Sequence, residues 1–230
     1  MPLLLALDTA TRVASVALVS DDGRAVGERT STVSTHSETL LDLIDQVLRA
    51  GGARLRELAG IACGAGPGSF TGLRIGLATC KGLCFGSERP LVLVSSLAAL
   101  AAQAPPDALA VACLDARKGE VFLAAFAGDE VVEAERALAP ADVAVALQAL
   151  HERSGRREIV LIGDAAARYP ELAAVGRWIV CTPSAAAVGR LAWRRLARGE
   201  ADDLDSAVPR YVRPPEITVS RKNFEKVDPR

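Results

Sequence analysis

Short apolar runs separated by polar turns open the chain. Residues 3–7 form one run that ends at Asp8, and residues 13–19 form a second. The Asp21-Asp22-Gly23 turn that follows is a strong hairpin signal, and residues 24–29 give a third, shorter strand. The pattern predicts an N-terminal meander of three antiparallel strands.

The same pattern returns in the second half of the chain. Residues 109–114 form an apolar run that ends at Asp115, and strands are again expected at residues 120–126 and 130–135. Asp115 therefore corresponds to Asp8. Self-similarity of this kind indicates an internal duplication.

Each meander precedes a segment whose apolar residues have helical spacing, at residues 37–50 and 140–150. Each helix leads to a buried strand, at residues 58–63 and 158–162. A glycine-bearing loop follows each strand and leads, sooner or later, to another helix. These further helices are expected at residues 73–85 and 184–197, the second after a strand at 178–181.

The chain is therefore interpreted as two copies of a β-β-β-α-β-α unit, joined at Pro105-Pro106-Asp107. This divides it into an N-terminal half (1–106), which would carry the partner-docking surface, a C-terminal half (107–215) and a flexible tail (216–230). The order resembles that of the actin-like ATPase fold (ASKHA, ribonuclease H-like), an α/β fold shared with sugar kinases and chaperone ATPases. A generic α/β protein with coincidental meanders is the alternative.

Composition narrows the function classes. The 230 residues are 50% hydrophobic and 24% charged, which is typical of a globular protein. Lys and Arg total 27 against 28 Asp and Glu. A protein that binds nucleic acid without a partner usually has an excess of basic residues, so this composition does not indicate one. No apolar run is long enough for a membrane span, and the odd count of five cysteines argues against a disulfide framework. A cytoplasmic protein without membrane contact is expected.

Two loops could hold a nucleotide phosphate. The first is the turn with Asp8, Thr9 and Thr11, which offers a carboxylate and two hydroxyls at a strand end. Its alternative is a turn in which these side chains bond only local backbone. We weigh the two interpretations equally.

The second loop, residues 64–72, follows a strand and opens a helix. Gly66 and Gly68 free the backbone, and Ser69 or Thr71 can cap the helix, whose first amides could receive an anion. No Gly-Lys-Ser/Thr follows, so it is not a P-loop. By itself the loop could be only a tight turn.

Small residues recur every four positions on the helix after this loop, at Gly72, Gly76, Cys80 and Cys84. Such a stripe lets another backbone come close. It indicates either packing inside the half or a helix-on-helix contact between subunits.

Several segments closely resemble the signature of the TsaB family, also called YeaZ, in order from about residue 3 to residue 213. The Gly-Pro-Gly-Ser-Phe-Thr-Gly run is highly specific, and the others support it. The segments are Leu5-Ala6-Leu7-Asp8-Thr9-Ala10-Thr11, His36-Ser37-Glu38, Gly66-Pro67-Gly68-Ser69-Phe70-Thr71-Gly72-Leu73-Arg74-Ile75-Gly76, Asp115-Ala116-Arg117-Lys118-Gly119-Glu120-Val121 and Pro209-Arg210-Tyr211-Val212-Arg213.

The resemblance implies a role. TsaB is a non-catalytic, actin-like pseudo-enzyme that docks its N-terminal half on the paralogue TsaD. With the ATPase TsaE they transfer a threonylcarbamoyl group to the adenosine beside the tRNA anticodon. This chain would then need no cofactor of its own, with ATP or ADP at or near the subunit contact, would reach tRNA only indirectly, and could form a homodimer when alone.

The catalytic paralogue carries a His-x-x-x-His metal motif after the strand that follows the glycine-loop helix. The corresponding positions here are Ser96 and Leu100, and leucine cannot ligate a metal. His36 and His151 each stand alone and receive no ligand role. No metal site is expected.

The resemblance also suggests a partner surface on two N-terminal helices. Residues on the same helices as the docking surface are the natural candidates. They are His36, Leu40 and Ile44 on the first helix and Arg74, Gly76, Leu77 and Lys81 on the second.

Two enzyme readings compete with the scaffold reading. A small-molecule kinase of the same fold would need a catalytic base, for which Asp115 is conceivable. A glycoprotease-like metallopeptidase would need a histidine pair that the chain lacks. In the tail after Pro215, Arg221, Lys222, Lys226 and Arg230 either contact tRNA phosphates or form a solvated end.

Overall fold

The computed structural model describes residues 1–32, 36–154 and 158–213, without the side chains of residues 36–38 and 154. The predicted tail at 216–230 and its basic residues lie outside this description. In the described parts, no helix is long and apolar enough to cross a membrane.

Two five-stranded sheets have the same internal order, with the first strand of each half at the centre. In each sheet the first three strands are antiparallel, and the fourth and fifth run parallel to the first. The first sheet contains β1 (Leu3–Asp8), β2 (Val13–Ser20), β3 (Ala25–Thr32), β4 (Gly60–Gly64) and β5 (Leu91–Val94). The second contains β6 (Leu109–Arg117), β7 (Glu120–Ala127), β8 (Glu130–Leu138), β9 (Ile159–Ile162) and β10 (Arg177–Ile179). The predicted duplication is confirmed.

Helices cover both faces of each sheet. They are α1 (His36–Ala50), α2 (Phe70–Ser87), α3 (Ser96–Ala101), α4 (Val143–Ser154), α5 (Ala165–Arg168) and α6 (Ala185–Leu196), with short 3-10 turns at Leu55–Glu57, Pro140–Asp142 and Pro170–Val175. Serine side chains cap α2, α3 and α6 at Ser69, Ser95 and Ser184, each accepting a hydrogen bond from a first-turn amide. The first copy is one strand and one helix longer than the predicted unit, because β5 and α3 complete it. In the second copy, β10 and α6 correspond to the strand and helix expected at residues 178–181 and 184–197, and the short helix α5 was not predicted.

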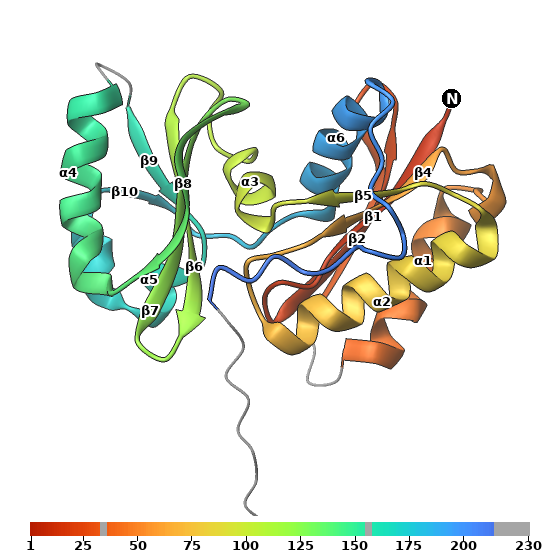
Figure 1. Ribbon diagram of the computed structural model, residues 1–230, viewed down its shortest axis with the longest axis horizontal. Coiled ribbons are helices and arrows are strands. Elements are labelled where there is room, and N and C mark those ends of the chain that lie inside the picture. The colour runs from red at the N-terminus through yellow and green to blue at the C-terminus, as the bar shows by residue number, and fades with distance from the viewer. Residues whose placement is uncertain (33–35, 155–157, 214–230) are drawn as a thin grey trace, which may run out of the picture.

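The two halves exchange their last helices. The α6 helix lies on the first sheet, where its alanines and Gly189 allow close approach: a Cβ at Gly189 would be 2.5 Å from Val19 Cγ2. The α3 helix, which the sequence pattern missed, packs Leu97 and Leu100 into the core of the second sheet. Both helices sit between the sheets (Figure 1). The boundary at residue 106 thus separates the strands of the two sheets, but not the helices that cover them.

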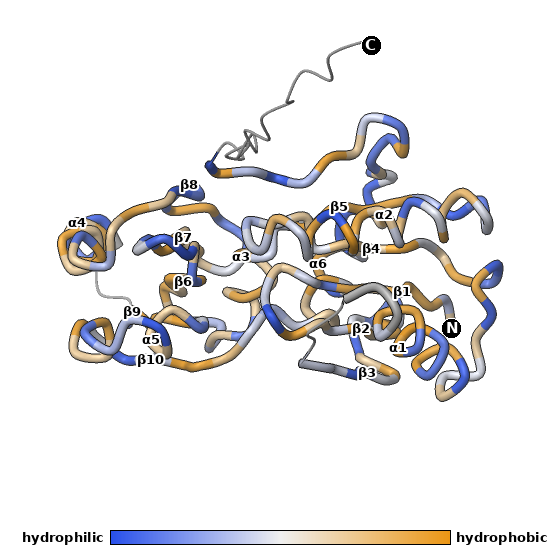
Figure 2. Tube along the Cα trace, turned by 90° about the horizontal axis from the view of Figure 1, so that it is seen from below, coloured by the Kyte–Doolittle hydropathy of each residue, from blue (hydrophilic) through white to orange (hydrophobic). Residues whose placement is uncertain are grey.

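A strap formed by residues 199–213 returns across the first half to the second. Asp202 bridges to Leu91 of β5, and Lys81 Nζ on α2 donates to the carbonyls of Asp205 and Ala207 at 3.3 and 3.1 Å. At its end Arg213 pairs with Glu120 of the second sheet. Figure 2 shows this strap along the outside of the molecule.

Candidate functional site

The glycine loop between β4 and α2 lies directly on the β1–β2 turn. The amide of Ser69 donates to the carbonyl of Ala10 at 2.6 Å, and Thr9 Oγ1 donates to the carbonyl of Gly72 at 2.8 Å. A Cβ at Gly68 would be 2.4 Å from the Ala10 carbonyl oxygen, and one at Gly72 would be 2.1 Å from that of Thr9. The glycines are therefore needed here for backbone-to-backbone contact.

Asp8 is the centre of a buried hydrogen-bond network. Its carboxylate accepts from the Ala10 amide at 2.8 Å and from Ser96 Oγ at 2.7 Å. Ser96 Oγ in turn accepts from the Gly66 amide at 3.2 Å. Burial raises the pKa of Asp8 from 3.8 to about 6, although both hydrogen bonds favour the charged form.

In this geometry the side chains of the first turn are bonded within the chain. Asp8 and Thr9 are fully buried and bonded within the chain, so neither side chain has a surface to offer to a nucleotide. Thr11 is 9% exposed and bonds locally to Val13. The Asp8 and Thr9 side chains are thus occupied within the chain, and nucleotide binding at this turn stays a prediction.

The residues predicted to bind phosphate in the second loop differ in how exposed they are. Gly66 is buried, and a Cβ there would be 2.9 Å from the carbonyl oxygen of Arg210 in the strap. Gly68 and Ser69 are half-buried and Thr71 is exposed. Ser69 is occupied as the helix cap, accepting from the Gly72 amide at 3.3 Å. Phosphate binding at this loop stays a prediction.

Most of the predicted partner residues point inward. Leu40, Ile44 and Leu77 are no more than 5% exposed and belong to the core of the first half, and Gly76 is buried against Thr9. The prediction is wrong for these four, because apolar residues at helical spacing mark the face that packs on the chain's own sheet. Lys81 holds the strap, as described above. The side chain of His36 lies outside the described residues.

Arg74 is exposed, but it joins an aromatic cluster rather than standing alone. Its guanidinium lies 3.9 Å from the Phe70 ring centroid, and its Nε donates to the Tyr211 hydroxyl at 3.1 Å. The Phe70 and Tyr211 rings lie 5.4 Å apart. The cluster fixes the end of the strap to the start of α2.

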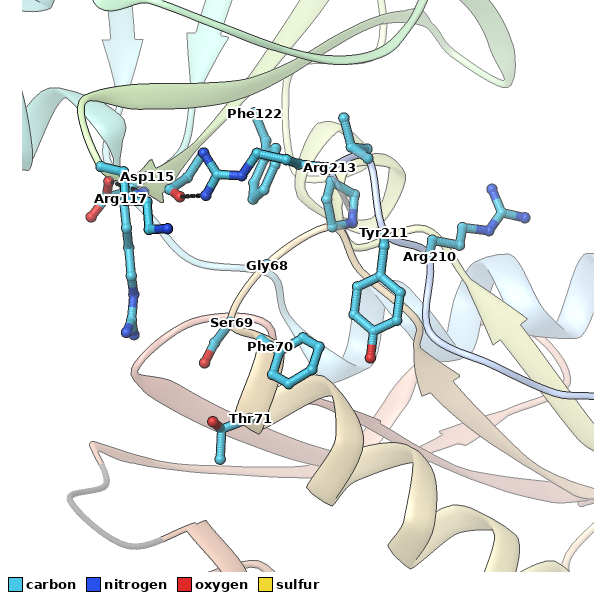
Figure 3. Close-up of a pocket in the computed structure, with 14 residues that line it drawn as sticks. Gly68, Ser69, Phe70, Thr71, Asp115, Arg117, Phe122, Arg210, Tyr211 and Arg213 are labelled. Carbon is cyan, nitrogen blue, oxygen red and sulfur yellow. Dashed lines mark hydrogen bonds between the residues drawn. The ribbon is translucent and has the colours of Figure 1, made fainter. Parts of the chain in front are cut away.

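A cleft between the two halves holds two adjoining pockets. The first, here the Tyr211 pocket, has a volume of about 310 Å³, and the second, the Arg168 pocket, about 510 Å³. Ser69, Asp115 and Arg117 line both. Figure 3 shows Arg117 reaching from the β6–β7 turn toward Ser69 on the opposite wall.

The β6–β7 turn that carries Arg117 is open, unlike its counterpart in the first half. Asp115 is half-buried; its Oδ1 accepts from the Arg117 amide at 2.8 Å and from the Tyr169 hydroxyl at 3.2 Å. The Asp115 amide donates to Asp164, whose pKa burial raises. Arg117 and Lys118 are exposed and adopt positive φ values of 59° and 52°.

The metal-motif positions are filled by the core. Ser96 belongs to the Asp8 network, and Leu100 is fully buried against the second sheet. Among the residues that the structure describes, no group of three or more His, Cys, Asp and Glu could hold a metal ion. His151 is exposed near the end of α4.

Sequence reasoning missed two features of this site. One is the role of Ser96, which joins β1, the glycine loop and α3. The other is the gathering of Arg12, Arg117 and Arg168 around the Arg168 pocket. The duplication could have indicated that Arg12 and Arg117 lie near each other, since they follow Asp8 and Asp115 in corresponding turns. Nothing in the sequence pattern indicates that Arg168 joins them.

Comparisons with known proteins agree with one another. A family model described as TsaD: tRNA N6-adenosine threonylcarbamoyltransferase matches residues 30–150. The tRNA threonylcarbamoyladenosine biosynthesis protein TsaB of Escherichia coli is 33% identical over 223 residues, which are 91% of this chain and 94% of the relative. The TsaB of Haemophilus influenzae is 38% identical over 135 residues, 56% of this chain and 55% of the relative.

Solved structures give the same picture. YeaZ from Pseudomonas aeruginosa is 31% identical with a TM-score of 0.78, over 92% of this chain and 100% of that one. The activator of the 2-hydroxyisocaproyl-CoA dehydratase from Clostridium difficile, with bound ADPNP, has a TM-score of 0.53 at 10% identity, over 87% of this chain and 98% of that one. The latter similarity shows the fold alone, and the predicted duplicated actin-like fold is confirmed.

Proposed function

This chain belongs to the TsaB (YeaZ) family of tRNA threonylcarbamoyladenosine biosynthesis proteins, and on that premise we propose that it is the non-catalytic partner subunit of the catalytic paralogue TsaD. In this role it would act in the cytoplasm, activate TsaD by binding it, and meet the ATPase TsaE through the complex. ATP or ADP would sit at or near the subunit contact.

The observation that carries this proposal is the outer face of α2. Phe85 on this face is 83% exposed, and Gly82 and Gly86 beside it are exposed in the helix interior or last turn. A Cβ at either glycine would meet nothing within 4 Å. A helical glycine costs about 1 kcal/mol relative to alanine, and packing within this chain does not require it at either position. A flat face with one protruding aromatic side chain suits the close approach of a partner helix.

The family match supports the choice of occupant. The model described as a threonylcarbamoyltransferase covers residues 30–150, a range that includes α2. A subunit homologous to its catalytic partner can present the same face to it, as paired actin-like halves would. The exposed Leu41 of α1, at 55%, is a further apolar side chain on the outside of the N-terminal half.

The closed first turn supports the non-catalytic part. A kinase of this fold would use that turn for phosphate and magnesium, whereas here Asp8 and Thr9 bond the chain itself. Ser96 and Leu100 fill the place of the paralogue's metal-binding histidines with hydrogen bonding and packing. The kinase and metallopeptidase readings therefore have less support than the scaffold.

Co-purification tests the proposal. The full chain is mixed with TsaD of the same organism and run on size exclusion, with and without ATP, and threonylcarbamoyladenosine is measured in tRNA. We expect a joint peak, and product only when both proteins are present with TsaE. No joint peak, together with ATP hydrolysis by this chain alone, would favour the kinase.

Two variants locate the surface. Gly82→Arg and Phe85→Asp should each weaken the complex at least about tenfold, since each places a bulky or charged group in a packed interface. Val145→Asp, at a residue on α4 that is 69% exposed, is the matched control and should leave the complex intact. Unchanged complex formation in both α2 variants would remove this face from the proposal.

A further inference from the structure

The cleft between the halves is basic although the chain as a whole is not. The full sequence carries 27 Lys and Arg against 28 Asp and Glu. The basic residues that line the Tyr211 and Arg168 pockets are Arg12, Arg117, Lys118, Arg168, Arg210 and Arg213, and the acidic ones are Asp115 and Asp164. Positive charge is therefore concentrated at this cleft.

Among the described residues, the arginines around the Arg168 pocket form no ion pair with a carboxylate. In the part of the chain that the structure describes, Arg12 and Arg117 make no ion pair, and Arg168 lies over the ring of Tyr169 at 5.9 Å. By contrast, arginines elsewhere pair closely, such as Arg195 with Asp202 at 2.9 Å. All three cleft arginines are exposed.

The backbone holds Arg117 in place against its own preference. The β6–β7 pairing shifts register between Asp115 and Arg117, and a bulge of this kind re-aims a side chain. Arg117 and Lys118 then occupy the left-handed region, which favours glycine. Only Gly119 beside them is the expected residue for such a turn. An arginine kept in a strained position at the rim of a pocket indicates a function for its side chain.

We propose that the Arg168 pocket, with Arg12, Arg117 and Arg168 at its rim, binds phosphates of the tRNA backbone directly. This inference rests on the proposed function, because it takes tRNA as the nucleic acid of the complex. It departs from the expectation that this chain reaches tRNA only indirectly.

The chemistry of the pocket fits backbone phosphate. Guanidinium groups bind phosphate oxygens through paired hydrogen bonds, and the polar residue Thr182 lines the same pocket. A free nucleotide fits less well, because Asp8 and Thr9, whose turn would take its phosphates and magnesium in this fold, are buried and bonded within the chain. Asp115 and Asp164 accept hydrogen bonds within the chain and leave the arginines as the groups that face an incoming anion.

Salt dependence of binding tests the proposal. Fluorescence anisotropy of an unmodified, labelled tRNA transcript is measured over a series of NaCl concentrations, with the full chain alone and with its TsaD complex. The variant Arg12→Gln/Arg117→Gln/Arg168→Gln is compared with Arg49→Gln/Arg54→Gln/Arg177→Gln. The control loses the same charge at exposed arginines that line neither pocket.

The cleft variant should bind tRNA at least about tenfold more weakly than wild type. The slope of log affinity against log salt should fall by about 3, one for each lost phosphate contact, while the control keeps the wild-type slope. Equal slopes and affinities in the two variants would overturn the proposal. Binding of inorganic triphosphate that needs these arginines, without arginine-dependent tRNA binding, would overturn it too and assign the pocket to a nucleotide.

Size exclusion of the same samples separates this inference from the proposed function. If the wild-type chain and TsaD do not elute as a joint peak, the result speaks against the scaffold role. An intact peak with unchanged tRNA binding in the cleft variant speaks only against the phosphate site.

Discussion

The turn after β1 and the turn after β6 occupy corresponding places in the two halves, but they have opposite environments. Asp8 is fully buried, with both carboxylate oxygens bonded inside the chain. Asp115 is half-buried and precedes the exposed Arg117 and Lys118. Asp8 and Thr9 of the first turn have become part of the core, and only the end of that turn, at Thr11 and Arg12, reaches the cleft. In the second turn Asp115 and Arg117 both line the cleft.

The helix that follows each parallel strand explains the difference. In the first half, the 18-residue α2 begins beside the turn, where Gly72 and Gly76 let the helix lie on Thr9, and Gly68 just before the helix lies on Ala10. In the second half, α5 has only 4 residues, and Gly163 approaches Cys113 within β6 rather than the turn: a Cβ there would be 2.0 Å from the Cys113 carbonyl oxygen. No long helix covers the second turn, so Arg117 and Lys118 stay exposed.

Replacing a glycine of the closed turn should have the largest effect. In Gly72→Ala the new Cβ would lie 2.1 Å from the Thr9 carbonyl oxygen, and backbone must shift, so we expect a loss of more than about 3 kcal/mol in the free energy of unfolding. Urea unfolding measures it. Gly82→Ala in the same helix meets no neighbour and should gain about 0.8 kcal/mol. Similar effects in the two variants would contradict the close contact.

The buried Asp8 should make stability fall as the pH rises. Its pKa of about 6 in the folded state, raised from 3.8, means that the folded state holds the proton more tightly than the unfolded state. The resulting stabilisation is fully present below pH 3.8 and is lost as the pH rises through 6, a change of about 3 kcal/mol.

Asp8→Asn removes this titration, and its Oδ1 can still accept from the Ala10 amide. Unfolding free energies at several pH values between 4 and 7 should therefore decline more steeply for the wild type than for the variant. Parallel curves would show that folding does not raise the pKa of Asp8.

Ser96→Ala should cost about 2 kcal/mol, because it leaves Asp8 Oδ2 and the Gly66 amide each without a hydrogen-bond partner. Ser69→Ala removes only a helix cap and should cost about 1 kcal/mol. Thermal unfolding ranks the two variants. The reverse ranking would mean that the network around Asp8 contributes less than the cap of α2.

The open turn should respond in the opposite sense. Arg117→Gly relieves a positive φ, and after the greater freedom of glycine in the unfolded chain is subtracted, a net gain of about 0.5 kcal/mol is expected. Glu88→Gly, at the end of α2 with a φ of 57°, should gain as much. Only Arg117→Gly should also weaken tRNA binding. Equal tRNA affinities in these two variants would show that the strained backbone at Arg117 does not serve tRNA binding.

The repeated pattern of apolar runs was enough to predict most of the strands and the fold, because buried strands appear as short apolar runs and amphipathic helices as apolar residues at helical spacing. It could not place α6 on the first sheet, since an alanine-rich face fits either sheet. It also could not distinguish residues that dock a partner from residues that pack within the chain. Leu40 and Leu77 were candidates for the partner surface and lie in the core of the first half. The cleft arginines come from three distant segments, so only the folded chain brings them together.

The exchange of α3 and α6 makes each half depend on the other for a layer of its core. A cut between residues 106 and 107 would leave the first sheet without α6 and the second without α3, and each fragment would expose the alanine and leucine positions that these helices cover. The fragments should be poorly folded alone and complement one another when mixed. In the intact chain, the packed helices α3 and α6 form the contact about which the two halves would rotate if the cleft opened. The strap is held by α2 at one end and by Glu120 of the second sheet at the other, so it limits how far the halves can separate.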